Sequence, residues 1–163
     1  MNETQFAVNE TMLTVTRTFD APIELVWRAW TEAELLDQWW APKPWKSETS
    51  YMDFSVGGYR LYFMIGPNGE KHPGRTDYLE INHHKNFAGE DSFCDEEGNI
   101  NPEMPVAKFQ NLFEPNSSKT VLIITTEYAS ETQIQQVIQM GMKEGLSMAF
   151  NNLDEVLNGL NSY

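Results

Sequence analysis

The side chains best suited to chemistry in this sequence are polar-tipped residues on the central predicted strands. They are Tyr59, Tyr62, Tyr78 and Glu80. A carboxylate enclosed by apolar side chains needs a hydrogen-bond donor, and Tyr59 or Arg17 could supply one to Glu80. One hypothesis is therefore acid–base catalysis by Tyr59, Tyr78 or Glu80. The alternative is a Glu80 that faces solvent and is inert.

The other reactive residue types do not form patterns typical of known chemistry. His83 and His84 are adjacent, and adjacent strand residues point to opposite faces, so we expect these residues and His72 to be surface histidines. Cys94 is the only cysteine, and no Gly-x-Ser-x-Gly elbow is present. The acidic residues lack the spacing of a calcium loop, and we assign them to a solvated hairpin; they are Glu90, Asp91, Asp95, Glu96, Glu97 and Glu103. The sequence predicts no metal, no cofactor and no nucleophilic enzyme.

Bulk composition favours one globular domain. The 163 residues are 40% hydrophobic and 12% aromatic, which is enough for a single core. The net charge is −13 with scattered basic residues, which disfavours nucleic acids and anionic membrane surfaces. The polar start has no features of a leader peptide, no apolar run could span a membrane, and the lone cysteine suits a reducing compartment. We expect a single cytoplasmic domain over residues 1–163, with its core at about 12–158.

Alternating apolar and polar residues predict a sheet of about seven strands. The first strand is Met12–Phe19, and Asn68-Gly69 predicts a tight hairpin further along. The other predicted strands cover residues 51–56, 59–65, 75–82, 86–93, 106–113 and 120–128.

The strand at residues 59–65 has two faces with different side chains. We expect Tyr59, Leu61 and Phe63 to face inward, and Tyr62 and Met64 to face outward. Exposed apolar strand surface often marks a contact, which points to a homodimer. By the same alternation Tyr78 and Glu80 share one face, but the pattern does not say which.

Two short helices and one long helix complete the pattern. Pro22 opens the first, and Thr31 with Glu34 resembles a capping box that starts the second. Four tryptophans on these helices pack against the end of the sheet, or alternatively Trp39 or Trp40 gates a pocket; the four are Trp27, Trp30, Trp39 and Trp40.

The longest predicted helix begins at a second capping box, Ser130 with Gln133, and runs to about Leu157. Methionines on this helix suit either an ordinary core or a surface that accepts irregular apolar shapes. Gly141 and Gly145 each cost about 1 kcal/mol inside a helix. We expect them to allow close approach of the sheet backbone or to leave empty space.

Three ordered segments resemble one family. Residues 19–42 are similar to the opening signature of the activator of heat-shock protein 90 ATPase homologue family. Gly57-Gly58-Tyr59 and Tyr78–Ile81 resemble its middle, and residues 142–146, Met-Lys-Glu-Gly-Leu, resemble its closing helix. Many relatives carry tryptophan where this chain has Leu146, which implies a larger or differently shaped cavity if that side chain lines it.

The resemblance implies an α+β helix-grip (START-like) fold, with a curved antiparallel sheet wrapped around the long C-terminal helix. It also implies non-catalytic binding of a small apolar or amphipathic molecule between sheet and helix. The expected ligand-binding residues are Phe54, Tyr59, Leu61, Phe63, Tyr78, Glu80, Phe109, Ile123, Met142, Gly145, Leu146 and Ala149.

Two other functions are compatible with the resemblance. One is a protein-interaction module that acts on a chaperone ATPase, although nothing here corresponds to the separate N-terminal domain of the eukaryotic activators. The other is an enzyme of the polyketide-cyclase type that uses Tyr59, Tyr78 or Glu80. We expect no nucleic-acid partner and no stable membrane association.

Overall fold

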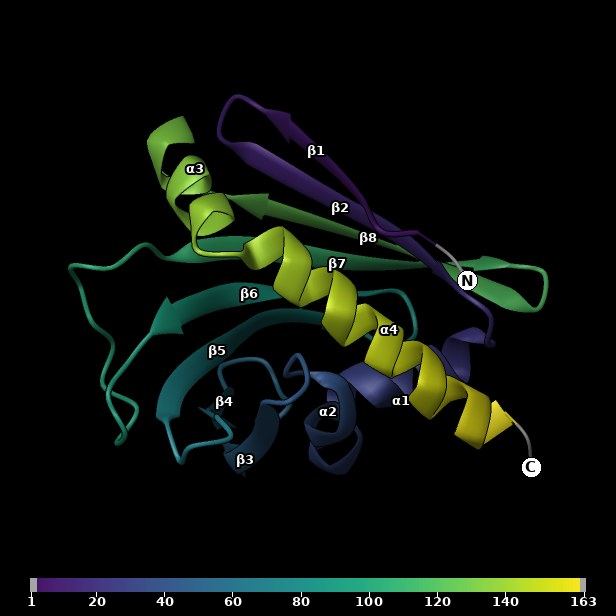
Figure 1. The fold of residues 1–163 in the computed structure, drawn as a ribbon. Coiled ribbons are helices and arrows are strands. Elements are labelled where there is room, and N and C mark those ends of the chain that lie inside the picture. Colours follow the sequence, from purple (N-terminus) through teal and green to yellow (C-terminus); the bar gives the residue numbers. More distant parts are fainter. Residues whose placement is uncertain (1–2, 162–163) are drawn as a thin grey trace.

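The computed structural model of the protein describes residues 3–161 and has the α+β architecture expected from the sequence (Figure 1). Its strands are β1 (Gln5–Asn9), β2 (Met12–Phe19), β3 (Lys46–Met52), β4 (Tyr59–Ile65), β5 (Lys71–Asn82), β6 (Asn86–Phe93), β7 (Ala107–Asn116) and β8 (Lys119–Glu127). Its helices are α1 (Ile23–Thr31), α2 (Ala33–Trp39), α3 (Glu131–Gln139) and α4 (Met142–Asn161).

The eight strands form one curved, fully antiparallel sheet in the order β1-β2-β8-β7-β6-β5-β4-β3. Helix α4 crosses the concave side of this sheet, and α1 and α2 lie beside its C-terminal half (Figure 1). The helix-grip prediction is therefore confirmed. The sheet has one strand more than expected, because β1 is a mostly exposed edge strand without the alternation that marks a half-buried strand.

Strand β3 has other bounds than the strand predicted over residues 51–56, whereas the predicted Asn68-Gly69 hairpin is confirmed. Strand β3 ends at Met52, so residues 53–56 are not part of a strand. The Asn68-Gly69 hairpin forms between β4 and β5, with Gly69 at a φ of 86° that favours glycine. None of the described helices is long and apolar enough to cross a membrane.

Helices α1 and α2 close one end of the sheet through their tryptophans. Trp39 is fully buried, and its indole N–H donates to the Ala29 carbonyl at 2.9 Å. The capping box expected at Thr31 is wrong. Glu32 is the N-cap of α2, and the Thr31 hydroxyl donates back to the Trp27 carbonyl at 2.8 Å.

The long C-terminal helix is two helices, which corrects the prediction of one. Ser130 does cap α3, because its hydroxyl accepts from the Gln133 backbone N–H at 3.2 Å. The chain then breaks at Gly141, whose φ of 92° lies in the left-handed region. Gly141 therefore ends one helix and redirects the next, and it makes no close contact with the sheet, since an added Cβ would meet nothing within 4 Å.

The C-terminal part of α4, which runs from Phe150 to Asn161 and is called its C-terminal half, is part of the core. Phe150 and Leu153 are fully buried, and the Phe150 ring packs edge-on against Phe19 with centroids 5.6 Å apart. The Asn152 amide donates to the Ala41 carbonyl at 3.1 Å, which fixes the helix to the segment after α2. This half of the helix is sealed against the sheet and the short helices.

Candidate functional site

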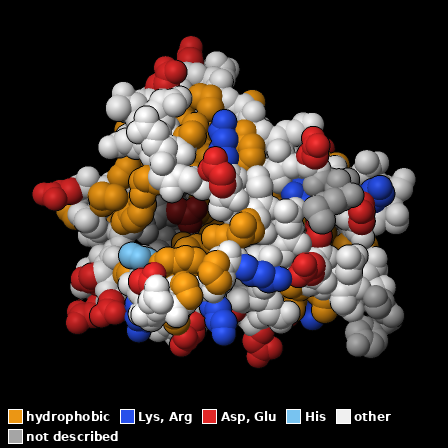
Figure 2. Space-filling model, in the orientation of Figure 1, with side chains coloured by type: hydrophobic (Ala, Val, Ile, Leu, Met, Phe, Trp, Pro, Cys, Tyr) orange, Lys and Arg blue, Asp and Glu red, His pale blue; other side chains and the backbone are white. Residues whose placement is uncertain are grey.

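A cavity of about 140 Å³ lies between the concave face of the sheet and the N-terminal half of α4. Figure 2 shows this face hollowed near its centre, with hydrophobic side chains around the hollow and an acidic side chain at its bottom. The apolar side chains that line the cavity are Leu13, Val15, Trp30, Leu36, Trp40, Phe87, Ala107, Phe109, Ile124, Met142 and Leu146. The polar ones are Arg60, Thr76, Tyr78, Asp91, Asn111, Thr126 and Tyr128.

The register of the sheet places three of these polar residues in one row. Arg60 on β4 pairs with Thr76 on β5, and Thr76 pairs with Asp91 on β6. Side chains at paired positions lie on the same face of a sheet, so all three point to the concave side. Because neighbouring strands are about 4.8 Å apart, the backbones of Arg60 and Asp91 are separated by about 10 Å.

Asp91 is the only acidic residue among the described residues that line the cavity. Its carboxylate accepts a hydrogen bond from the Thr76 hydroxyl at 2.6 Å. Burial raises the pKa of Asp91 to about 6, because the charged form loses solvation, and the hydrogen bond from Thr76 and the charge of Arg60 offset this only in part. At neutral pH, Asp91 therefore carries a poorly solvated negative charge.

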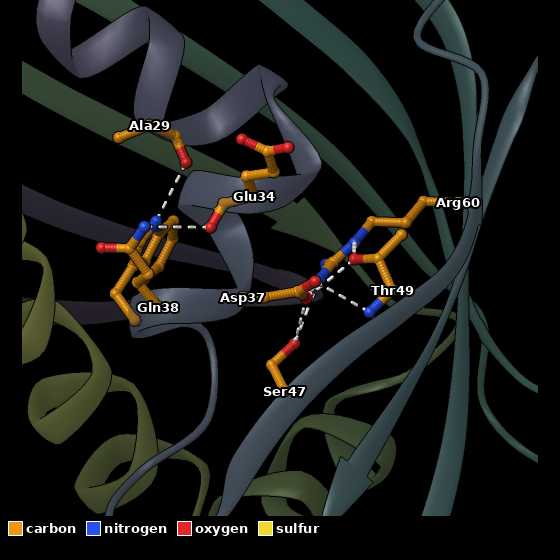
Figure 3. A network of polar contacts seen from close by, with 8 residues as sticks. Ala29, Glu34, Asp37, Gln38, Ser47, Thr49 and Arg60 are labelled. Carbon is orange, nitrogen blue, oxygen red and sulfur yellow. Dashed lines mark hydrogen bonds and ion pairs between the residues drawn. The ribbon is translucent and has the colours of Figure 1, made fainter.

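Arg60 is buried, and its charge is balanced by an ion pair with Asp37 (Figure 3). Its guanidinium donates to the Asp37 carboxylate and to the Ser47 hydroxyl, each at 3.2 Å, and to the Thr49 hydroxyl at 3.1 Å. Asp37 in turn accepts from Ser47 and Thr49, so the pair is held in a network of hydrogen bonds. The network joins α2 to β3 and β4 and fixes this wall of the cavity.

Two buried residues that line the cavity, Trp30 and Asn111, carry hydrogen-bond donors. The indole N–H of Trp30 is buried and has no hydrogen-bond partner among residues 3–161. Asn111 is 4% exposed, lines the cavity and carries an amide that can donate and accept. Burial also raises the pKa of Tyr78, and it raises the pKa of Tyr128 to about 12, so both phenols stay neutral donors.

The structure places four of the predicted ligand-binding residues on the cavity wall. They are Tyr78 on β5, Phe109 on β7, and Met142 and Leu146 on α4. Leu146, where many relatives carry tryptophan, therefore borders the cavity. The part that these side chains play in binding stays a prediction.

Three residues of β4 lie on the opposite face from the one predicted. Leu61 packs near Gly98 of the loop after β6, and the Tyr59 ring stacks under the Arg75 guanidinium, 4.1 Å away. The Phe63 ring contacts the Lys71 ammonium at 4.2 Å. The inward face of β4 carries Arg60 instead. The inference failed because both faces of β4 are covered, so Leu61 and Phe63 are buried without facing the cavity.

Tyr62 shares the inward face of β4 with Arg60, which corrects its assignment to the outside. It is partly buried beside the Trp40 ring, with centroids 5.8 Å apart, and the Arg60 guanidinium lies 4.3 Å from its own ring. The expected apolar contact surface of Tyr62 and Met64 does not exist in that form. The prediction of a homodimer therefore no longer has the exposed apolar surface on which it was based.

Tyr78 and Glu80 do not share a face, because a β-bulge lies between them. Tyr78 pairs with Gly89, whereas Glu80 pairs with Ala88, so the extra residue Leu79 reverses the alternation. Tyr78 is buried on the cavity wall, and Glu80 is exposed and accepts from the Asn86 amide at 2.9 Å. The hypothesis of an enclosed Glu80 carboxylate is wrong.

The remaining predicted residues lie near the cavity without lining it. Phe54 packs against the Tyr78 ring with centroids 4.8 Å apart, and Ala149 is buried in the core. Ile123 is the outward neighbour of Ile124, which does line the cavity. Gly145 faces the chain after α2, where an added Cβ would meet Pro42 at 3.9 Å. Gly145 therefore makes no close contact with the sheet backbone.

The sequence missed Asp91 because the acidic residues around it suggested a solvated loop. The structure places Asp91 within β6, on the same face as Phe87. Alternation along the correctly predicted strand 86–93 would have found it. His83 is exposed, as expected, but His83 and His84 do not point to opposite faces, since they lie in the β5–β6 turn with ring centroids 3.8 Å apart, both against Trp27. No metal-binding group of three or more acidic, histidine or cysteine residues occurs within residues 3–161.

Comparison with known proteins agrees with this architecture. A solution structure from Arthrobacter aurescens is 30% identical, covers 95% of this chain and 91% of its own, and superposes with a TM-score of 0.88. A crystal structure from Mycobacterium smegmatis is 31% identical, covers 95% of both chains, and has a TM-score of 0.85. A third, from Nitrosomonas europaea, is 28% identical with a TM-score of 0.82, covering 94% of this chain and 97% of its own. No protein with a curated function matches.

The family signature extends over most of the sequence. Residues 20–158 match the sequence profile of the family described as "Activator of Hsp90 ATPase homolog 1-like protein". The match includes both short helices, the six strands β3 to β8, helix α3 and nearly all of α4. The chain belongs to the Activator of Hsp90 ATPase homolog 1-like family.

Proposed function

We propose that the protein binds a small amphipathic molecule in the cavity between the sheet and the N-terminal half of α4, without catalysing a reaction. The observation that carries the proposal is the composition of the cavity wall. Most of the lining is apolar, yet it also includes Asp91 and Trp30, whose buried indole N–H has no hydrogen-bond partner among residues 3–161. Ligand sites typically combine apolar walls with a few such polar groups.

The volume limits the size of the guest. An engineered cavity of about 150 Å³ holds one benzene ring, so the 140 Å³ here suits a single ring with a short substituent. A long lipid chain would need α4 to move away from the sheet. Buried polar groups without partners are costly, so a guest with one polar tip binds better than a hydrocarbon of equal size.

The proposal is tested by thermal shift and native mass spectrometry with benzyl alcohol and related single-ring compounds. A bound guest raises the melting temperature in proportion to its concentration above Kd. Leu146→Trp should fill the cavity and abolish the shift. Met148→Trp, on the exposed side of the same helix, is the matched control and should leave the shift unchanged. Equal shifts in both variants, or none in the wild type, would contradict the proposal.

A chaperone partner, as the family description suggests, remains an alternative prediction. We also propose that the protein is cytoplasmic and that residues 1–163 form a single folding unit. A catalytic function is favoured less, because Glu80 lies outside the cavity and Tyr78 is held neutral by its raised pKa.

A further inference from the structure

The charge of the cavity wall indicates more about the guest than its size does. Asp91 and Arg60 are the two charged residues among the described lining residues. Arg60 is paired with Asp37, whereas among residues 3–161 Asp91 forms no ion pair and its carboxylate accepts a hydrogen bond from the neutral Thr76 hydroxyl. A carboxylate can accept up to about four hydrogen bonds. The unmet charge in the cavity is therefore negative.

The aromatic lining adds a second, independent preference. Six rings border the cavity: Trp30, Trp40, Tyr78, Phe87, Phe109 and Tyr128. Ring faces attract cations within about 6 Å, and aromatic walls around a cation are a recurrent way of binding ammonium groups. A carboxylate at the bottom of an aromatic cavity favours a positively charged guest over a neutral or negatively charged one.

The electrostatics of the whole molecule act in the same direction. The net charge is −13, and such a field raises the encounter rate of small cations and lowers that of anions. Fatty acids and other carboxylates would meet both this field and the Asp91 charge. An anionic guest is therefore disfavoured at long range and at the site.

Resting on the binding function proposed above, we propose that the guest is a primary amine on a body of about one ring, with its ammonium group directed at Asp91. The ring occupies the apolar space below Leu146 and Met142. Trp30 on α1 also lines the cavity, and its buried indole N–H has no hydrogen-bond partner among residues 3–161, so an acceptor group on the guest would satisfy it. No bond is made or broken in this step, and the protein acts as a carrier or sensor of the amine.

The test compares benzylamine, benzyl alcohol and benzoate by isothermal titration calorimetry at about 0.15 M salt, which screens the surface charges. We expect benzylamine to bind at least about tenfold more tightly than benzyl alcohol, since a charge-assisted hydrogen bond is stronger than a neutral one. Benzoate should bind most weakly. Asp91→Asn should remove the preference for the amine, so that benzylamine and benzyl alcohol bind this variant within about twofold of each other.

Glu90→Gln is the matched control, because Glu90 is the neighbour of Asp91 on β6 and does not line the cavity. It removes the same charge outside the site and should retain the amine preference. Equal affinity for amine and alcohol in the wild type, with both blocked by Leu146→Trp, would overturn the amine inference and leave the binding function intact. No binding of any of the three compounds would overturn both.

Discussion

The two halves of α4 pack differently against the same sheet. In the C-terminal half, Phe150, Leu153 and Leu157 are buried against strands and short helices. In the N-terminal half, Met142 and Leu146 are only partly buried and border a cavity. The amino-acid types are similar in both halves. The difference therefore comes from what lies opposite: α1 and α2 fill the space below one half, and the curvature of the sheet leaves it open below the other.

The sharpest way to test this contrast is to make the same truncation in both halves. Leu153→Ala removes a fully buried side chain and should lower the free energy of unfolding by about 3 kcal/mol. Leu146→Ala only enlarges a space that already exists, and we expect a loss of about 1 kcal/mol. Urea denaturation of both variants measures the difference. Equal losses would mean that the helix is packed uniformly along its length.

A smaller effect on stability is expected at Asp91, which lines the cavity beside the N-terminal half of α4. Asp91 has a pKa of about 6 in the folded protein, above its value of about 3.9 in unfolded chains, so the folded state binds the proton more tightly. The resulting stability is complete below about pH 4 and is lost as the pH rises through 6. The charged and titratable groups around Asp91 are Arg60, Tyr62, Asp77, Tyr78 and Tyr128, and the side chains of α4 that line the cavity are uncharged.

Asp91→Asn removes this titration while keeping an acceptor for Thr76. At pH 7 the variant should be more stable than the wild type by about 1–2 kcal/mol. At pH 4 the two proteins should be nearly equal. Denaturation curves at both pH values provide the measurement, and a variant that is less stable at pH 7 would show that Asp91 is not desolvated.

The smallest effect on stability is expected at Gly141, which directly precedes the N-terminal half of α4. Gly141 has a φ of 92°, so Gly141→Ala should cost about 1 kcal/mol. Gly159 lies within α4 in open space, and Gly159→Ala should instead stabilise by about 0.5–1 kcal/mol. Thermal unfolding of the two variants distinguishes a required break from an ordinary helical glycine. Shifts of the same sign would contradict the assignment of the break to Gly141.

The sequence was sufficient for most of the architecture, because alternation along the strands and the cap at Ser130 are local signals. Strands β4 and β6 were predicted with the observed bounds, and the order of elements followed. The break at Gly141 was missed because glycine within an apolar helical pattern does not reveal its φ. The bulge between Tyr78 and Glu80 was missed for a similar reason, since one extra residue in a strand leaves no mark in the residue types.

The site was harder to predict than the fold, because it depends on which face of each strand is covered. Leu61 and Phe63 are buried, and the sequence correctly indicated that much. Their cover is the loop after β6 and the Lys71 side chain, which only the tertiary structure reveals. Arg60 and Asp91 look like surface residues in the sequence. Their burial depends on the register that aligns them through Thr76.

The most direct test of the open half of α4 is an NMR titration with benzyl alcohol. We expect intermolecular NOEs from the bound ring to the methyl groups of Leu146 and Ile124, which line the cavity from α4 and β8, and a shift of the Trp30 indole N–H signal. Absence of these NOEs at saturating ligand, or NOEs to surface residues only, would show that the helix is closed on the sheet and that no guest enters.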